Sequence, residues 1–152
     1  MEPVNWFMNV VTQHYFDFNG RARRAEFWWF ILVYVIGAIL VSAVGGLIGL
    51  RQPLSLLYSL GLLAPHLGVT IRRLHDTNRT GWLVLIAWVP GIVWEILVAG
   101  AVMMGSFVGV AMISGLFGLI FLAGVIVLIY FLAQPGTAGS NDYGPDPKAG
   151  LA

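Results

Sequence analysis

Two long stretches without charged side chains constrain this chain more than any other feature of its sequence. Phe27 to Leu50 contains no charged residue, and Trp82 to Leu132 contains only Glu95. The first stretch is long enough to cross about 30 Å of hydrocarbon as a helix. A single helix over the second would be about 75 Å long, so this stretch is expected to fold back. Soluble domains carry about 25% charged residues, whereas this chain has 10%, which favours a membrane protein.

The pattern predicts an all-α integral membrane protein with four transmembrane helices, preceded by an N-terminal amphipathic interfacial helix. Between the two long stretches, Leu54 to Ile71 is a shorter apolar segment that contains Pro65. This proline is expected to kink its helix and to free the carbonyl of Gly61. We expect an interfacial segment at 1–19, a membrane domain at 20–134 and an irregular tail at 135–152, with spans near 27–50, 54–71, 82–100 and 112–132.

Two further features complete this prediction. Small residues favour a reversal of the last long stretch at Gly100, Gly105, Ser106 and Gly109. At the N-terminus, apolar residues at helical spacing predict one face made of Val4, Phe7, Met8, Val11, Tyr15 and Phe18. That segment is too polar to span, so it is expected to lie in the membrane interface. A helix that packs on protein alone is the alternative.

The basic residues predict the orientation. Four spans place the polar segments 19–26 and 71–82 and the tail on one membrane face. Of the eight basic residues, only Arg51 falls on the other face. The favoured face carries Arg21, Arg23, Arg24, Arg72, Arg73, Arg79 and Lys148. By the positive-inside rule, both termini are therefore expected in the cytoplasm.

Three motifs resemble those of a known family. The segments 18–28 (FNGRARRAEFW), 72–82 (RRLHDTNRTGW) and 141–147 (NDYGPDP) are similar, in order and spacing, to the entry, central and ending motifs of domain-of-unknown-function family 805. One departure is Asn78-Arg79-Thr80, where the family pattern has Gly-Arg-Ser. The family consists of small bacterial inner-membrane proteins. The resemblance therefore implies a multi-pass protein of the bacterial cytoplasmic (inner) membrane, and it implies no established activity or catalytic residue.

The polar segments supply the candidate site. If the second span continues as a helix through residue 79, Arg72, Asp76 and Arg79 form a stripe flanked by His75, with Arg73 about 100° away. Arginine forks match phosphate oxygens, so the stripe predicts binding of an anionic headgroup or another anion, with Asp76 orienting its neighbours. The full candidate set for an anion or a partner is Arg21, Arg23, Arg24, Glu26, Arg72, Arg73, His75, Asp76 and Arg79, and the two clusters are expected to converge.

Simpler interpretations stand beside this one. The arginines can serve topology alone and reach water, with Asp76 as a counter-ion. For Arg21, Arg23 and Arg24 this interpretation is favoured, whereas for His75 and Asp76 the two stand level. Three functions follow: a lipid-handling or transport component that binds an anion, an accessory subunit that docks a partner, or a membrane-embedded enzyme using His75 and Asp76. The enzyme is disfavoured because no activated nucleophile is evident, and no catalytic residue is assigned.

His66 and Glu95 are intramembrane polar residues, which are functional candidates by default. For both, a structural role is favoured: His66 can bond a carbonyl near the kink, and Glu95 can reach water if the reversal begins at Gly100. A later reversal would bury Glu95 and change this balance. No metal site is expected, because the histidines lack ligand spacing, and no cofactor or nucleic acid is expected. The expected partners are membrane lipids, anionic ones included; a protein partner or a homo-oligomer stays open.

Overall fold

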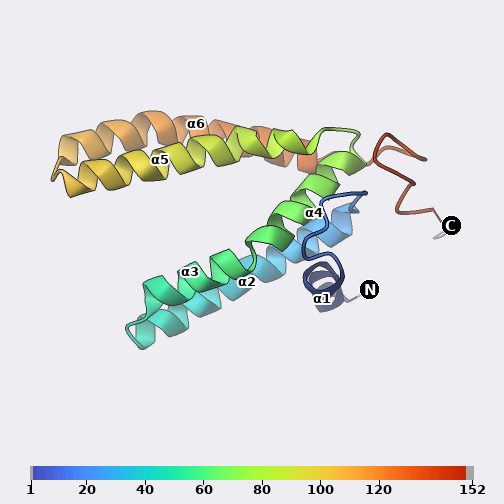
Figure 1. Ribbon diagram of the computed structural model, residues 1–152, viewed down its shortest axis with the longest axis horizontal. Helices are drawn as coiled ribbons and strands as arrows, with labels where there is room; N and C mark the ends of the chain where they lie inside the picture. Colours follow the sequence, from blue (N-terminus) through green and yellow to red (C-terminus); the bar gives the residue numbers. More distant parts are fainter. Residues whose placement is uncertain (1, 150–152) are drawn as a thin grey trace. The chain divides into compact units, whose positions relative to one another are not determined.

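The computed structural model describes residues 2–149, and this part of the chain contains helices and no β-strand. The chain divides into two compact units. Within the described residues, the first comprises 2–79 and 135–149, and the second comprises 80–134. Figure 1 shows the order of the helices along the chain. The all-helical class predicted from the sequence is confirmed.

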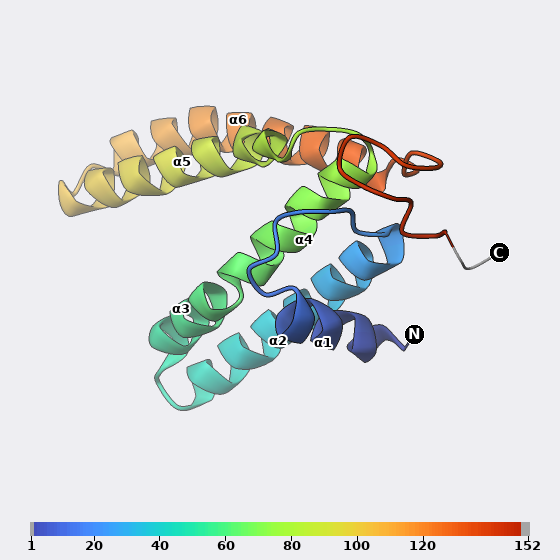
Figure 2. The ribbon, with the colours of Figure 1, turned by 45° about the vertical axis from the view of Figure 1, so that its right-hand side comes forward.

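The first unit contains four helices. They are α1 (Pro3–Gln13), α2 (Arg24–Leu47), α3 (Arg51–Gly61) and α4 (Leu63–Asp76). The chain leaves α2 through a tight turn in which Gly45 lies against the backbone of Arg51, so that a Cβ on this glycine would lie 2.8 Å from Arg51 Cα. As a result α3 and α4 run back along α2 (Figure 2). This return brings the end of α4 to the beginning of α2.

The return path is bent rather than straight. Helices α3 and α4 meet at Leu62 with a bend of 44°. Pro65 lies in the first turn of α4 and cannot donate a hydrogen bond to the carbonyl four residues back. That carbonyl, on Gly61, accepts a hydrogen bond from the Tyr15 hydroxyl. The predicted kink and the predicted free carbonyl are therefore confirmed, and the segment after α1 satisfies the carbonyl.

The N-terminal helix packs on α2. Val10 is fully buried, and the ring of Phe7 stacks on Phe30 with centroids 5.3 Å apart. The helix ends at Gln13, before Tyr15 and Phe18 of the predicted apolar face. Val10, which is buried, was not among the residues of the predicted face. The spacing of apolar residues defines a face, but the packing on α2 decides which residues are buried. Its place at a membrane interface stays a prediction.

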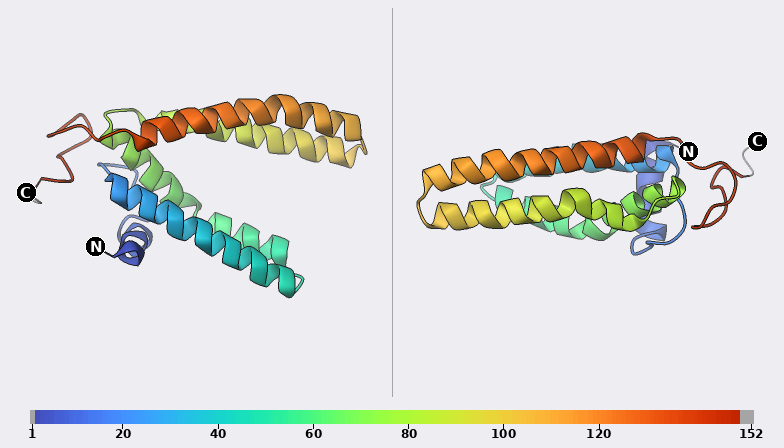
Figure 3. Two further views of the ribbon diagram at one scale, coloured as in Figure 1. Left: turned by 180° about the vertical axis from the view of Figure 1, so that it is seen from behind. Right: turned by 90° about the horizontal axis from the view of Figure 1, so that it is seen from above.

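The second unit is a helical hairpin. It contains η1 (Gly81–Val84), α5 (Leu85–Met103) and α6 (Phe107–Ala133), and α5 and α6 lie side by side in both views of Figure 3. The reversal falls at residues 104–106, where Gly105 has φ +65°. The reversal begins later in the sequence than Gly100 and takes fewer residues than the predicted stretch from Gly100 to Gly109. Gly124 allows close approach, because any Cβ there would collide with the carbonyl oxygen of Ile86.

In the part of the chain that the structure describes, three helices are long and apolar enough to cross a membrane: 24–47, 81–103 and 107–133. The bent pair α3–α4 would make a fourth span if both parts cross together. The exact number of four spans, and the domain limits that depend on it, stay predictions.

Candidate functional site

Asp76, the last residue of α4, is the centre of a buried polar site in the first unit. Only 2% of this residue is exposed. Arg21 Nη2 lies 3.0 Å from Asp76 Oδ1, and Arg73, one helical turn earlier, contacts Oδ2. A buried carboxylate is tolerated when it is paired and hydrogen-bonded. The Arg21–Asp76 pair joins the end of α4 to the segment that leads into α2, and the Arg73–Asp76 pair, within α4, completes the pairing of the carboxylate.

The two polar segments converge, as predicted, through Arg21–Asp76 and a second ion pair, Arg72–Glu26. The predicted stripe is wrong in two respects. Helix α4 ends at Asp76, and Asn78 has a left-handed φ of 56°, so Arg79 does not continue the helical face. Arg73 does not point away from the site, because residues three apart on a helix are neighbours and Arg73 contacts Asp76.

The C-terminal tail, residues 135–149, closes over this site. Arg21 donates from Nη1 to the carbonyl of Gly139 and from Nη2 to the carbonyl of Thr137, each at 2.6 Å. Its Nε donates to Asp76 Oδ1 at 3.0 Å. Arg21 is therefore buried by partners from two distant parts of the chain. It does not extend to water, as the interpretation based on topology alone would have it.

The tail also caps α4. The last carbonyls of a helix lack partners within the helix. Here the N–H of Thr137 donates to the carbonyl of Asp76, and the side-chain amide of Asn141 donates to the carbonyl of His75, each at 2.8 Å. Gly136 passes so close to the Asp76 carboxylate that a Cβ would collide with it. The polar ending of the sequence thus acts as the C-terminal cap of a helix far away in sequence.

His75 is held on two sides. Its Nδ1–H donates to the carbonyl of Gly20 at 3.1 Å, and its ring stacks on Tyr143 with centroids 3.9 Å apart and an interplanar angle of 6°. The first contact fixes the loop before α2, and the second fixes the tail. His75 therefore links the same three segments as Asp76, through different atoms.

Asp146 stabilises the turn at the end of the tail. Its carboxylate accepts hydrogen bonds from the backbone N–H of Lys148 at 2.9 Å and of Gly139 at 3.2 Å. The N–H of Lys148 and then that of Gly139 favour the charged form, so the pKa of Asp146 lies below its usual value.

Within the described residues, Arg72 has hydrogen-bond donors that its neighbours do not use. Its Nη1 lies 2.8 Å from Glu26 Oε1, close enough for an ion pair although the two atoms are not aligned as a hydrogen bond. The carbonyl of Arg72 accepts from the N–H of Ala22 at 3.0 Å. Its Nε and Nη2 are buried and have no hydrogen-bond partner within residues 2–149. We call these two nitrogens the unbonded edge of Arg72.

Asp17 is the other carboxylate near Arg72. It accepts from His14 Nδ1 at 2.8 Å and from the N–H of Asn19 at 3.1 Å. Partial burial raises the pKa of Asp17, but these hydrogen bonds and the charge of Arg72 outweigh burial, and the pKa lies below its usual value. Asp17 therefore belongs to the electrostatic surroundings of the unbonded edge.

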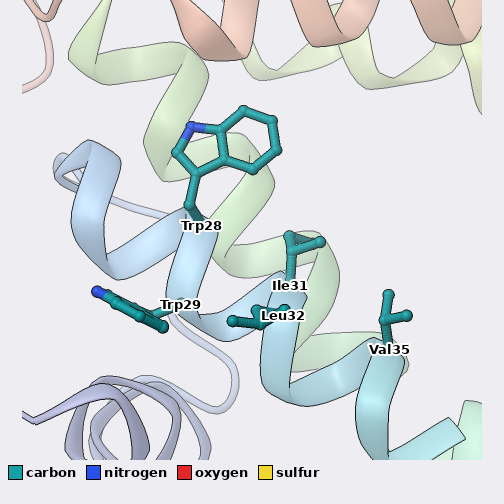
Figure 4. Close-up of a pocket in the computed structure, with 5 residues that line it drawn as sticks. All are labelled: Trp28, Trp29, Ile31, Leu32 and Val35. Atoms are coloured by element: carbon teal, nitrogen blue, oxygen red, sulfur yellow. The ribbon is translucent and has the colours of Figure 1, made fainter.

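The remaining arginines surround this buried core. Arg23 and Arg79 are half-buried and Arg24 is exposed. One turn after Arg24 on α2, Trp28 and Trp29 are 40% and 37% exposed. Figure 4 shows these two indoles at one end of an apolar hollow that continues along α2. Its other lining residues are Ile31, Leu32 and Val35.

The two other polar candidates lie outside this site. His66 stacks on Tyr34 and Phe30, with ring centroids 5.2 and 6.2 Å apart, and its carbonyl accepts from the Thr70 hydroxyl at 2.7 Å. Glu95 is exposed on α5. The reversal falls at residues 104–106 rather than beginning at Gly100. A later reversal was the condition under which Glu95 was expected to be buried and a structural role to be less favoured. Residues 2–149 contain no group of three or more His, Asp or Glu side chains that could hold a metal.

The sequence interpretation missed the tail residues of the site: Thr137, Gly139, Asn141 and Tyr143. The ending motif contains Asn141 and Tyr143, and this was the available signal. Spacing within a motif does not show which distant segment it contacts.

The fold and the site together define a helical membrane protein with three or four spanning segments and a buried arginine site closed by its own tail. The chain belongs to the family described as Protein of unknown function (DUF805), whose model matches residues 15–145. The resemblance noted in the three motifs is thereby confirmed.

Curated relatives cover almost the whole chain. Inner membrane protein YhaI of Escherichia coli K12 is 35% identical over 148 residues, which is 97% of this chain and 98% of the relative. Inner membrane protein YhaH of the same strain is 30% identical, covering 95% of this chain and 98% of the relative. Uncharacterized protein YiiR is 30% identical, covering 91% of each. No solved structure matches the chain.

Proposed function

We propose that this protein is a multi-pass protein of the bacterial inner membrane that binds an anionic phospholipid at headgroup depth, as a lipid-handling or transport component. The names of two relatives support the location. The basic residues support cytoplasmic termini, because the polar segments and the tail hold all of them except Arg51.

One observation carries the proposed binding function: an excess of arginine lies beside exposed tryptophans at the same end of α2. The site holds Arg21, Arg72 and Arg73 buried against only two buried carboxylates, Asp76 and Glu26. Arg23, Arg24 and Arg79 add charge at its edge. Polybasic sites gain about 1 kcal/mol per Lys or Arg from anionic lipid.

The tryptophans support the depth of the site. Trp and Tyr are enriched where a helix passes from hydrocarbon to water, and Trp28 and Trp29 come one helical turn after Arg24. The apolar hollow of Figure 4 begins at these indoles and runs along α2. A phospholipid fits this order, with its phosphate among the arginines at the start of α2 and its glycerol and acyl carbons along the hollow.

The enzymatic alternative has less support. Both Asp76 oxygens contact arginines, which leaves the carboxylate poorly placed to act as a base. The Thr77 hydroxyl donates to the carbonyl of Leu74, and the Thr80 hydroxyl accepts from the N–H of Trp82. Neither hydroxyl is activated by a base in these contacts.

The test is retention of phosphatidylglycerol, compared with phosphatidylcholine, by the full chain in native mass spectrometry. We expect wild type to retain phosphatidylglycerol selectively. Arg24→Gln should lower retention about fivefold, the equivalent of about 1 kcal/mol for one charge. Arg51→Gln removes the same charge near the other end of α2 and should have no effect. Equal retention of both lipids, or equal loss in the two variants, would contradict the proposal.

A further inference from the structure

The unbonded edge of Arg72 has a specific shape. In a guanidinium, Nε and Nη2 carry N–H bonds that lie in the plane of the group and point in parallel from one of its edges. Such an edge matches two oxygens of one carboxylate or phosphate, whereas an ammonium acts as a point charge. In Arg72 the Glu26 contact uses Nη1, which lies on another side of the group. The two parallel donors are therefore left together.

The unbonded edge of Arg72 is buried, so water outside the protein does not satisfy its two donors. Arg72 is 3% exposed, and its two donors find no partner within the part of the chain that the structure describes. A buried donor without a partner costs about 1–3 kcal/mol, more for a charged group. Most buried polar groups are satisfied by protein or by an ordered molecule. The edge therefore lacks an acceptor, and residues 2–149 do not supply one.

We propose that the unbonded edge of Arg72 binds two oxygens of one oxyanion, most directly a phosphate. The inference rests on the proposed function for the lipid headgroup as the source of that phosphate; free inorganic phosphate carries the same chemistry. Two carboxylates act on Arg72: Glu26 on α2, which pairs with its Nη1, and Asp17 on the loop after α1, whose pKa is lowered in part by the Arg72 charge. Asp17 is thus a negative charge that competes with a bound anion.

Entry of the anion requires the loop between α1 and α2 to move. This loop is tied to α4 by the Ala22 N–H bond to the Arg72 carbonyl and by the Gly20 carbonyl, which accepts from His75. Asp17 lies on the same loop, so displacing the loop also removes the competing carboxylate. Binding should therefore speed hydrogen exchange at Ala22.

The test measures phosphate binding by calorimetry and phosphatidylglycerol retention by native mass spectrometry, both on the full chain in detergent. Arg72→Lys keeps the charge and removes the two parallel donors, so it should weaken both at least about tenfold. Arg51→Lys makes the same exchange at an exposed arginine near the other end of α2 and should change binding less than about twofold. Chloride, which offers one atom rather than two oxygens, should not compete with phosphate at equal concentration.

A second variant keeps the inference testable if Arg72→Lys fails to fold. Asp17→Asn removes the competing charge and should strengthen phosphate binding about fivefold, the equivalent of about 1 kcal/mol. Asp142→Asn removes one exposed tail charge and serves as its control. Unchanged or weaker binding in Asp17→Asn would contradict the inference.

The outcomes separate the two proposals. If Arg24→Gln lowers lipid retention while Arg72→Lys does not, the proposed function stands and the Arg72 site is refuted. If phosphate binds through Arg72 but phosphatidylglycerol is not retained, the lipid function fails and the oxyanion site stands. If wild type binds neither, the edge holds only an ordered water, and both proposals are overturned.

Discussion

The two units of this protein hold their helices together in different ways. In the first, buried ion pairs and tail hydrogen bonds join the end of α4 to the start of α2. In the second, residues 80–134 contain one charged residue, Glu95, and α5 and α6 meet through small and aromatic side chains. Helices in lipid associate through close packing and polar contacts. Here the two kinds of contact are largely divided between the two units.

This difference shows which contacts decide how the helices pair. Close packing of apolar helices needs only small residues at the right spacing, and many surfaces of that kind exist in one chain. A buried carboxylate needs particular partners at particular distances, and its misplacement leaves charges unpaired. The arginine site can therefore fix which helix ends meet, whereas the hairpin is specified mainly by its short turn.

The largest loss of stability should come from a substitution at Asp76, the centre of the ion-pair network. Asp76→Ala leaves the buried Arg21 and Arg73 without their carboxylate, and removing one partner of a buried pair costs about 3–5 kcal/mol. We expect a loss of that size in the free energy of unfolding in mixed micelles. Arg24→Ala, at an exposed position, should change it by less than about 0.5 kcal/mol. Similar losses in the two variants would show that the network does not stabilise the first unit.

In the hairpin, the corresponding variant is Gly124→Leu. Its side chain would collide with the backbone of Ile86, and overpacking costs about 1–3 kcal/mol. Gly118→Leu on the same helix meets no atom within 4 Å and serves as the control. Unfolding in mixed micelles should separate the two variants. Equal stability would mean that α5 and α6 do not depend on this approach.

A smaller effect is expected where the tail meets α4. Tyr143→Ala removes the ring that stacks on His75, a contact worth about 0.5–1.5 kcal/mol. The tail should then open more often, and hydrogen exchange at Thr137, whose N–H bonds Asp76, should become about 2–10-fold faster. Tyr143→Phe keeps the ring and should exchange like wild type. Slow exchange in both would mean that the hydrogen bonds of the tail with Arg21 and α4, rather than the ring stacking, hold it in place.

The smallest effect is expected when acid protonates Asp146 in the tail. The pKa of Asp146 is lowered by the N–H of Lys148 and then of Gly139, so its contribution is present above the usual value of 3.8 and is lost as pH falls through the lower, folded value. The amide NMR signals of Gly139 and Lys148 should stay constant from neutral pH to about pH 5 and shift below the usual value. Asp146→Asn should abolish this acid transition. A transition at higher pH would contradict the assignment.

Sequence patterns were sufficient for the all-helical class and for the presence of helices able to cross a membrane. Apolar length alone separates a membrane protein from a soluble one, because hydrocarbon thickness sets the length of a span. Pro65 predicted both the bend and the free Gly61 carbonyl, since proline lacks the N–H that would bond it. The meeting of the two polar segments followed from the short turn between α2 and α3, which returns the chain to the same end.

Packing across the chain settled the rest. Periodicity put Arg72, Asp76 and Arg79 on one stripe, but the helix ends at Asp76. Arg73 pairs with Asp76, and Arg72 pairs with Glu26 on another helix. The tail as a cap of α4 was equally out of reach, since Thr137 and Asn141 bond carbonyls about sixty residues away. Local spacing determines which side chains share a face; which distant donor satisfies a buried acceptor depends on how the segments pack.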